Sequence, residues 1–262
     1  MKAVFVLLLA AVAFGFKLMT FNIKNGHNMA GNSDIAGTAK VIKNQGPIIV
    51  GLQEVDVNTN RNPHDQPTQL AEKTGLTYHH FHKTIPFQGG KYGVATLSKV
   101  KPIATAEFAF HAPGSAAPAC STEDIYCRGV SAMKIELAPQ HYVWYLSTHL
   151  GLNSGEALTE VKQIATEFIP TLAKPYDAVF VVGDFNVKPD SSTYKYMVGD
   201  GGFTDMWKNC GSGNGYTYDA ESPHARIDFI FQKPLKYNCT GIEVINTQAS
   251  DHRPLVATFA DL

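Results

Sequence analysis

The stretch AVFVVGDFNVKPD, residues 178–190, decides the fold. Its first five residues form an apolar run rich in β-branched side chains, which is typical of a strand buried on both faces. Side chains alternate along a strand, so we expect Asp184 and Asn186, at the strand exit, on the same side. A carboxylate and an amide at a sheet edge suit a divalent cation and a phosphate, although a simple Asp/Asn turn is equally compatible with these letters.

Composition indicates an ordinary globular chain. The 262 residues are 44% hydrophobic and 17% charged, which fits one sizeable domain and argues against disorder. Lys and Arg number 22 against 23 Asp and Glu, for a net charge of −1. A chain without a global basic field can bind a polyanion only through a local patch or a metal.

The amino terminus has the layout of a secretory signal peptide. Lys2 precedes the apolar run 3–14, which contains the small residues Ala11 and Ala13 near its end and is followed by Gly15. We therefore predict a signal peptide over residues 1–16 and a single domain over 17–262, with an apolar first strand as the alternative for the leading run. The run is too short for a comfortable membrane span, and no later run approaches one. The expected product is a secreted, extracellular monomer.

The number of cysteines agrees with a secreted protein. Cys120, Cys127, Cys210 and Cys239 form an even set, which in a secreted chain favours two disulfides with three possible pairings. We favour Cys120–Cys127 with Cys210–Cys239, because each bridge would tie down a loop.

Hydrophobic periodicity alternates strands with a few helices. The expected strands cover 17–23, 47–52, 78–82, 92–98, 102–110, 129–137, 142–149, 178–182, 227–231 and 255–259, and the expected helices 35–45, 70–73, 155–174 and 191–197. Ser33 and Ser154 are candidate caps for two of these helices. This pattern predicts an α/β (α+β) fold: a two-layer β-sandwich of mixed sheets flanked by helices, in one domain.

Polar residues recur where these strands begin or end. The set is Asn22, Glu54, His149, Asp184, Asn186, Asp228, Asp251 and His252. We expect one edge of the sheets to gather them. Carboxylates bind a hard cation such as Mg²⁺, and a histidine held by an aspartate can take a proton from water. The mixture suits metal-assisted attack on a phosphodiester.

Seven stretches together resemble the endonuclease/exonuclease/phosphatase superfamily, which has the fold of deoxyribonuclease I. They are TFNIKNG (20–26), GLQEVD (51–56), YGVATLSK (92–99), LSTHL (146–150), VVGDFNV (181–187), RIDFIF (226–231) and SDHRPL (250–255). They occur in the family's order and span the chain from Lys17 onward. The resemblance implies a deoxyribonuclease I-like fold.

The resemblance also implies a metal site. Glu54 corresponds to the principal ligand, with Asn22 and Asp251 completing or supporting the site. The implied cofactor is Mg²⁺, with Mn²⁺ or Ca²⁺ as alternatives.

Catalytic roles follow from the same resemblance. His252 corresponds to the base that activates water, oriented by Asp228. His149 corresponds to a phosphate-binding residue and possible general acid, with the division of acid and base between the two histidines left open. Asp184 and Asn186 correspond to residues at the phosphate, and Asp184 to a possible ligand of a second metal.

The segment from Glu54 to Gln66 resembles a less characterised branch of secreted and bacterial members, some related to proteins of lipid-anchor metabolism. In that branch Arg61 is a candidate phosphate or head-group contact. The alternative is a surface arginine bonded to Asp65.

Three functions compete. The first is a secreted Mg²⁺-dependent phosphodiesterase acting as an endonuclease on DNA or RNA. The second is the same chemistry on a lipid or sugar phosphodiester, such as sphingomyelin or a phosphoinositol-type (GPI) anchor, which the near-neutral charge favours. The third is a catalytically silent binding module, which the intact set of polar residues disfavours. Plasmid nicking separates the first two, and loss of function on His252→Ala separates an enzyme from a binding module.

Overall fold

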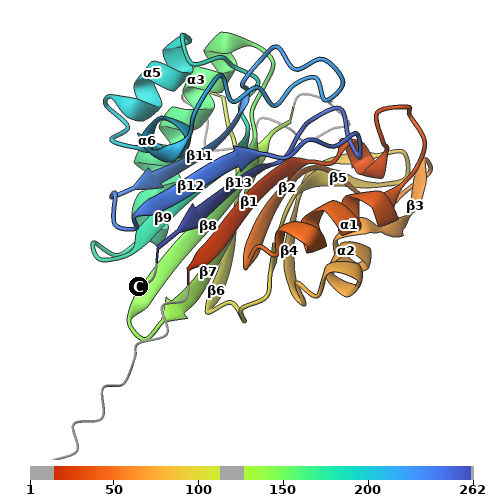
Figure 1. Ribbon diagram of the computed structural model, residues 1–262, viewed down its shortest axis with the longest axis horizontal. Coiled ribbons are helices and arrows are strands. Elements are labelled where there is room, and N and C mark those ends of the chain that lie inside the picture. Colours follow the sequence, from red (N-terminus) through yellow and green to blue (C-terminus); the bar gives the residue numbers. More distant parts are fainter. Residues whose placement is uncertain (1–14, 113–126, 261–262) are drawn as a thin grey trace, which may run out of the picture.

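The computed structural model describes residues 15–112 and 127–260, which form two mixed β-sheets packed face to face (Figure 1). Helices cover the outer faces of the sandwich. The predicted two-layer α/β architecture is confirmed.

The first sheet is built around the amino-terminal strand. Its order is β12 (Cys239–Val244), β13 (Leu255–Phe259), β1 (Phe16–Asn22), β2 (Ile49–Thr59), β5 (Gly90–Ser98) and β4 (Tyr78–Phe87), with β3 (Asn62–Asp65) paired to β2. β1 and β2 run parallel, whereas their other neighbours are antiparallel. The sequence did not predict β12, and β2 continues well past the predicted end at residue 52.

The second sheet is built around the strand of the opening stretch. Its order is β10 (Thr204–Asp205), β11 (Asp228–Lys233), β9 (Ala178–Asp184), β8 (His141–His149), β7 (Gly129–Ala138) and β6 (Ala104–Ala109). β8 and β9 run parallel, so their carboxyl ends share one edge of the sheet. Every residue of β9 is buried, as its continuous apolar pattern indicates.

The inner faces of the sheets form the central core, which includes Leu18, Tyr145, Phe180, Ile230 and Phe259. Outside the first sheet lie α1 (Ile35–Gln45) and α2 (Gln66–Thr74), beside the short 3-10 turn η1 (Lys24–Gly26). Outside the second lie α3 (Ser154–Gln163), the π-helical segment η2 (Ile164–Phe168), α4 (Ile169–Leu172) and α5 (Ser192–Val198), and α6 (Met206–Cys210) contacts β11 and β12.

Local chemistry corrects two predicted helices. Asp34, not Ser33, caps α1 by accepting from the Gly37 amide, and Asn153, not Ser154, caps α3. The long helix predicted over 155–174 contains a π-helical segment and ends at Leu172. Pro170 lacks an amide hydrogen and crowds the carbonyl four residues earlier, so an undisturbed α-helix cannot pass through it.

The predicted processing features lie at the margins of the described chain. Residues 1–14 of the predicted signal peptide lie outside it, and β1 begins at Phe16, one residue before the predicted start of the domain. The Cys210–Cys239 disulfide is present and agrees with an oxidising compartment. Cys127 is also disulfide-bonded, while its predicted partner Cys120 lies outside the described residues. Among the described helices, none has both the length and the apolar character needed to cross a bilayer.

Candidate active site

Asp184 lies at the centre of the candidate site because strand register places a partner on each side of it. It ends β9, where its Cα pairs with His149 at the end of β8 and with Asp228 at the start of β11. All three residues are buried. The strand ends therefore bring these side chains together.

Gly183 permits this close approach. Its φ is +146°, and a Cβ atom there would collide with the carbonyl oxygen of Thr148 on the neighbouring strand. Any side chain would therefore separate β8 from β9 just where His149 and Asp184 meet.

Glu54 reaches the site through a β-bulge. The register of β2 against β5 shifts between Leu52 and Val55, and Glu54 has a φ of +57°. Bulges of this kind redirect a side chain out of the strand alternation. The Glu54 carboxylate accepts a 3.0 Å hydrogen bond from Nδ2 of Asn22, which also donates to Oδ2 of Asp184 at 3.0 Å. One amide thus links two carboxylates that come from different sheets.

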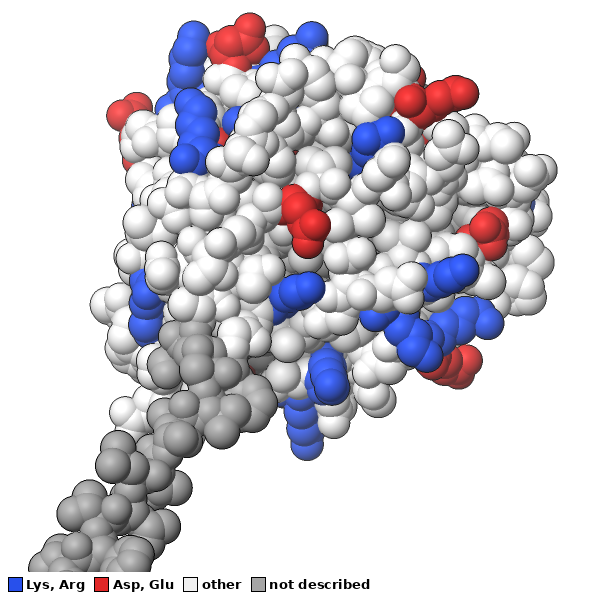
Figure 2. Space-filling view, viewed as in Figure 1, with Lys and Arg blue, Asp and Glu red and all other residues white. Residues whose placement is uncertain are grey.

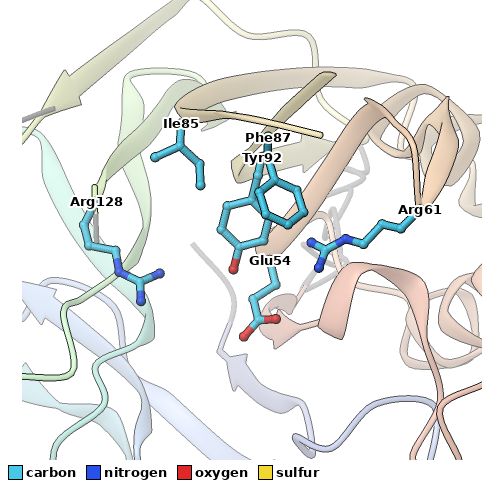
Figure 3. A pocket seen from close by; sticks show the side chains of 6 residues that line it. All are labelled: Glu54, Arg61, Ile85, Phe87, Tyr92 and Arg128. Carbon is cyan, nitrogen blue, oxygen red and sulfur yellow. The ribbon is translucent and has the colours of Figure 1, made fainter. Parts of the chain in front are cut away.

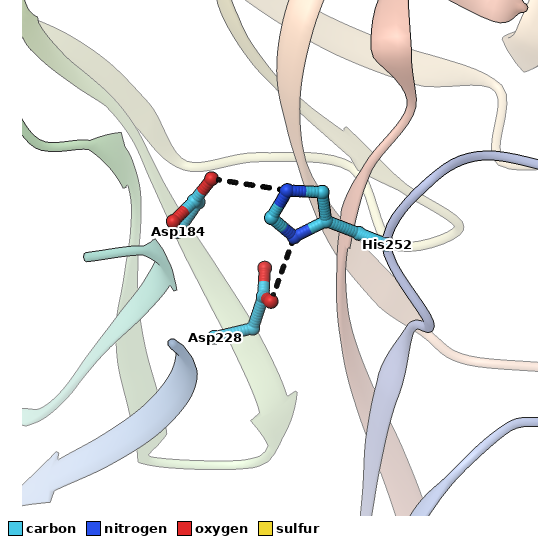
Figure 4. Close-up of side chains that lie close together, drawn as sticks. All are labelled: Asp184, Asp228 and His252. Atoms are coloured by element: carbon cyan, nitrogen blue, oxygen red, sulfur yellow. Dashed lines mark hydrogen bonds and ion pairs between the residues drawn. The ribbon is translucent and has the colours of Figure 1, made fainter. Parts of the chain in front are cut away.

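His252 lies between two carboxylates (Figure 4). Its Nδ1 is 2.9 Å from Oδ2 of Asp228, and its Nε2 is 3.5 Å from Oδ2 of Asp184. Burial acts to lower the pKa of His252, but the charges of Asp228 and Asp184 outweigh it and raise the pKa to about 10. Burial also raises the pKa of Asp184. The Tyr218 ring packs against His252 with centroids 4.9 Å apart, which restrains the imidazole.

His149 contacts a cation, whereas His252 contacts carboxylates. Nη1 of Arg128 lies 3.0 Å from Nδ1 of His149. An arginine can only donate, so Nδ1 must be an unprotonated acceptor and the proton of the neutral ring sits on Nε2, 3.5 Å from Oδ2 of Asp184. Burial, together with the charges of Arg128 and His252, holds the pKa of His149 well below its usual value. The ring therefore presents an N–H to the site.

Asn186 is oriented by a turn, because β9 ends at Asp184. Its φ is +52°, its backbone amide donates to Oδ1 of Asp184, and its Nδ2 donates to the carbonyl of Leu150, both at 2.9 Å. Strand alternation therefore does not place this residue; the turn after β9 keeps it beside Asp184.

Asp251 lies next to the site but its charge is paired elsewhere. Its carboxylate is 3.3 Å from Nζ of Lys24 and accepts from the Ser250 hydroxyl at 3.2 Å. The same hydroxyl is 2.8 Å from the backbone oxygen of Asn22. Asp251 is thus linked to Asn22 through Ser250. Its role as a metal ligand stays a prediction.

Arg61 forms a two-pronged ion pair with Asp56, not with Asp65. Nε and Nη2 lie 2.7 and 2.9 Å from the two carboxylate oxygens of Asp56, whose side chain is fully buried. Asp65 instead caps α2 by accepting from the Thr68 amide. The alternative assignment of Arg61 to Asp65 is wrong.

Arg61 also lines a pocket beside Glu54 (Figure 3). We call it the arginine pocket; its volume is about 170 Å³, and its walls are Glu54, Arg61, Ile85, Phe87, Tyr92 and Arg128. The two guanidinium groups point into it from opposite sides. The pocket shares Glu54 and Arg128 with the site, where they contact Asn22 and His149, so it adjoins the position of a bound substrate.

The donor set at this edge fits a divalent cation. Ligand atoms of Asp184, Asp228 and His252 lie within 4.8 Å of one another, and all three residues are buried. Within the described part of the chain, Oδ1 of Asp228 is buried without a hydrogen-bond partner. The carboxylate of Glu54 adds an oxygen donor that is linked to Asp184 through Asn22. Carboxylate and amide oxygens are the ligands that Mg²⁺ and similar hard cations prefer.

The sequence did not identify Arg128 as a site residue, although the signal was present. Arg128 directly precedes β7, whose Val130 pairs with Thr148 near the end of antiparallel β8. The start of β7 therefore shares an edge with His149, just as the start of β11 does with Asp184. Asp228 was predicted because polar residues next to strand ends gather at one edge of the sheets. The same reasoning applies to Arg128.

A family model described as "Endonuclease/Exonuclease/phosphatase family" matches residues 19–252. The chain belongs to this family. The match covers the strands and loops that supply Asn22, Glu54, His149, Asp184 and His252. Members of the family are metal-dependent phosphoesterases, in agreement with the buried Asp/Asp/His cluster.

Solved structures share the fold at low identity. An endonuclease/exonuclease/phosphatase from Beutenbergia cavernae is 17% identical, with a TM-score of 0.76 over 94% of this chain and 72% of that one. A mannosyl-6-phosphatase from Bacteroides thetaiotaomicron is 15% identical (TM-score 0.75; 93% and 99% covered). The human nocturnin catalytic domain with a bound sulfate anion is 16% identical (TM-score 0.70; 95% and 94% covered). No curated protein matches the chain significantly.

Proposed function

We propose that this phosphoesterase hydrolyses a phosphodiester by attack of a water molecule activated at His252. The observation that supports this most strongly is the contact of His252 with Asp228 through Nδ1, which leaves Nε2 facing Asp184 and the centre of the site. When the ring is neutral, Asp228 holds the proton on Nδ1, so Nε2 is free to accept a proton from water. Asp228 also stabilises the imidazolium that forms.

The proposed cofactor is Mg²⁺, held by Glu54, Asn22 and Asp184, with Asp251 in support; Asp228 and His252 of the buried cluster are assigned to proton transfer. When bound, the cation supplies Lewis-acid stabilisation of the charge that develops on the phosphate oxygens. Asp184 is buried, so little water surrounds its carboxylate. Electrostatic interactions with the phosphate are stronger where water is excluded.

His149 is proposed to donate a hydrogen bond from Nε2 to a phosphate oxygen. Its Nδ1 is occupied by Arg128, so release of the Nε2 proton would leave an imidazolate. The general-acid role is therefore replaced by that of a fixed donor to the developing charge. Asn186, fixed by its bond to Leu150, is proposed to donate the second hydrogen of its Nδ2 to the same phosphate.

Among substrates, a compact head group is favoured over duplex nucleic acid. The arginine pocket is small, and the chain carries a net charge of −1. On the face shown in Figure 2, Lys and Arg side chains lie in separate groups among Asp and Glu. Nucleic-acid binding rests mainly on Lys and Arg contacts to phosphates, and the net charge does not favour it. The endonuclease activity predicted from the sequence thus becomes the second candidate.

The test is hydrolysis by the purified protein of bis-p-nitrophenyl phosphate, plasmid DNA, RNA and sphingomyelin, with Mg²⁺ or with EDTA. We expect chelation to abolish turnover and Glu54→Gln to raise the Mg²⁺ concentration needed for half-maximal rate by about 10-fold or more. Glu72→Gln, at an exposed glutamate of α2, is the matched control.

Each outcome decides between the candidates. Nicking of plasmid DNA would restore the endonuclease, whereas cleavage of the small diester without nicking supports the compact substrate. Turnover that is indifferent to EDTA contradicts the metal-dependent mechanism. Silence on all substrates would leave the binding module.

A further inference from the structure

The arginine pocket has a chemistry that selects among head groups. Its volume of about 170 Å³ is below the roughly 300–1,000 Å³ typical of sites for drug-sized ligands. It can therefore hold one small substituent of a substrate whose scissile phosphate lies at the adjoining Glu54 end. What that substituent is depends on the groups that line the walls.

The aromatic wall is already engaged by a cation. The Arg61 guanidinium carbon lies 4.5 Å from the ring centroid of Phe87 and 5.6 Å from that of Tyr92. The fork of Arg61 is held in this position by both carboxylate oxygens of buried Asp56. An aromatic pair of this kind could otherwise enclose a quaternary ammonium. Because Arg61 already lies over both rings, a choline group would find the aromatic faces occupied and the charge of Arg128 opposite.

Hydrogen-bond donors remain available on both sides. Arg61 uses Nε and Nη2 for Asp56, which leaves Nη1. Arg128 uses Nη1 for His149, a neutral acceptor that does not cancel its charge, and its buried Nε has no hydrogen-bond partner in the described chain. Burial and the charge of Glu54 raise the pKa of Tyr92, so its hydroxyl keeps its proton and can donate.

We infer that the arginine pocket is a specificity subsite for a second anionic group, a phosphate substituent, on the head group of the substrate. The planar forks of arginine match the oxygens of phosphate, and charge-assisted bonds of this type are the strong ones. The substrate class is then a compact polyol that carries a further phosphate, and choline esters such as sphingomyelin are excluded. This inference rests on the proposed function, because it takes the scissile phosphate to lie beside Glu54.

Competition against hydrolysis of bis-p-nitrophenyl phosphate tests this subsite at saturating Mg²⁺. The competitors are myo-inositol 1-phosphate, myo-inositol 1,4-bisphosphate and phosphocholine. We expect the bisphosphate to inhibit at about 10-fold lower concentration than the monophosphate, with phosphocholine the weakest of the three. Isothermal titration of the same three compounds provides a readout that does not need turnover.

Two variants locate the effect. Arg61→Met removes one fork, and the double variant Asp56→Asn with Arg61→Met does so without leaving a buried, unpaired carboxylate that could prevent folding. Either should reduce the advantage of the bisphosphate to about 3-fold or less. Lys101→Met removes one positive charge at an exposed position away from the pocket and should leave that advantage intact.

The outcomes separate this inference from the proposed function. Equal inhibition by the three compounds, or a preference that survives the double variant, overturns the subsite. Absence of turnover together with selective, Arg61-dependent binding of the bisphosphate overturns the proposed hydrolysis and supports the subsite. Absence of both turnover and selective binding overturns both.

Discussion

His252 and His149 differ in role although their surroundings are equally dry. Each is 5% exposed, and each places Nε2 3.5 Å from the same oxygen of Asp184. The Nδ1 atom of His252 contacts a carboxylate, whereas that of His149 contacts a guanidinium. The pKa of His252 is accordingly raised to about 10 and that of His149 is held well below its usual value.

The comparison teaches that burial alone does not set the state of a histidine. Desolvation acts to lower both pKa values, so the sign of the neighbouring charge makes the difference. His252 holds a proton between its two carboxylates and must release it before it can act as a base, while His149 is confined to donating a hydrogen bond. The pair thus divides proton transfer and charge stabilisation between two sides of Asp184.

The largest effect is expected from His252→Ala. Loss of a positioned general base typically costs about 10²–10⁴ in rate, and we expect a drop in kcat toward the upper end of that range. Hydrolysis of bis-p-nitrophenyl phosphate with Mg²⁺ measures it, and His79→Ala, at an exposed histidine of β4, is the control. A variant that retains more than a tenth of the wild-type kcat would show that His252 is not the base.

Asp228→Asn tests the partner of His252 through stability. The pKa of His252 in the folded protein, about 10, lies above its ordinary 6.5, so its contribution to stability is complete below about pH 6.5 and is lost as pH rises toward 10. In EDTA we expect Tm to fall by on the order of 5 °C across that range. Asp228→Asn should flatten the fall because it removes the charge that raises the pKa.

Differential scanning fluorimetry between pH 6 and 10 measures this dependence, with Asp190→Asn at an exposed site as the control. The same variant should lower kcat by about 100-fold, because Nδ1 loses the carboxylate that orients the ring. An unchanged pH slope would mean that Asp228 does not carry the effect.

Arg128→Met tests the partner of His149 and should lower kcat least of the three substitutions. Without Arg128 the Nδ1 of His149 can be protonated, so the ring is no longer confined to the Nε2–H tautomer. We expect kcat to fall by about 10- to 100-fold. Nitrogen NMR of the ¹⁵N-labelled histidines reports the tautomer directly.

Arg128→Lys is the matched variant, since lysine also donates and cannot accept. It should restore the Nε2–H tautomer and part of the rate. If His149 keeps the same tautomer in Arg128→Met, the arginine does not determine the state of the ring.

The sequence predicted the residues at strand ends better than their side-chain partners. The apolar run before Asp184 was enough to place that residue at the end of a buried strand, and Asp228 was found in the same way. Side-chain alternation does not apply to Asn186, because the strand ends two residues earlier and a turn sets its position. The carboxylate that pairs with Arg61 was also misassigned, because Asp65 caps a helix.

What escaped prediction depended on contacts between distant segments. The bulge that redirects Glu54 shows only in the register of β2 against β5. Arg128 meets His149 because β7 and β8 are antiparallel neighbours. The bulge cannot be read from one segment alone, whereas the place of Arg128 just before a strand was open to the same reasoning that found Asp228.

The sequence by itself determined the layered fold, the family and the set of polar residues at the strand ends, because these depend on local periodicity and on the order of short motifs. Only the tertiary structure decided which charge faces each histidine and which groups line the pocket beside Glu54. The physical reason is that electrostatic effects in a buried site depend on distances of a few ångströms between residues far apart in the chain.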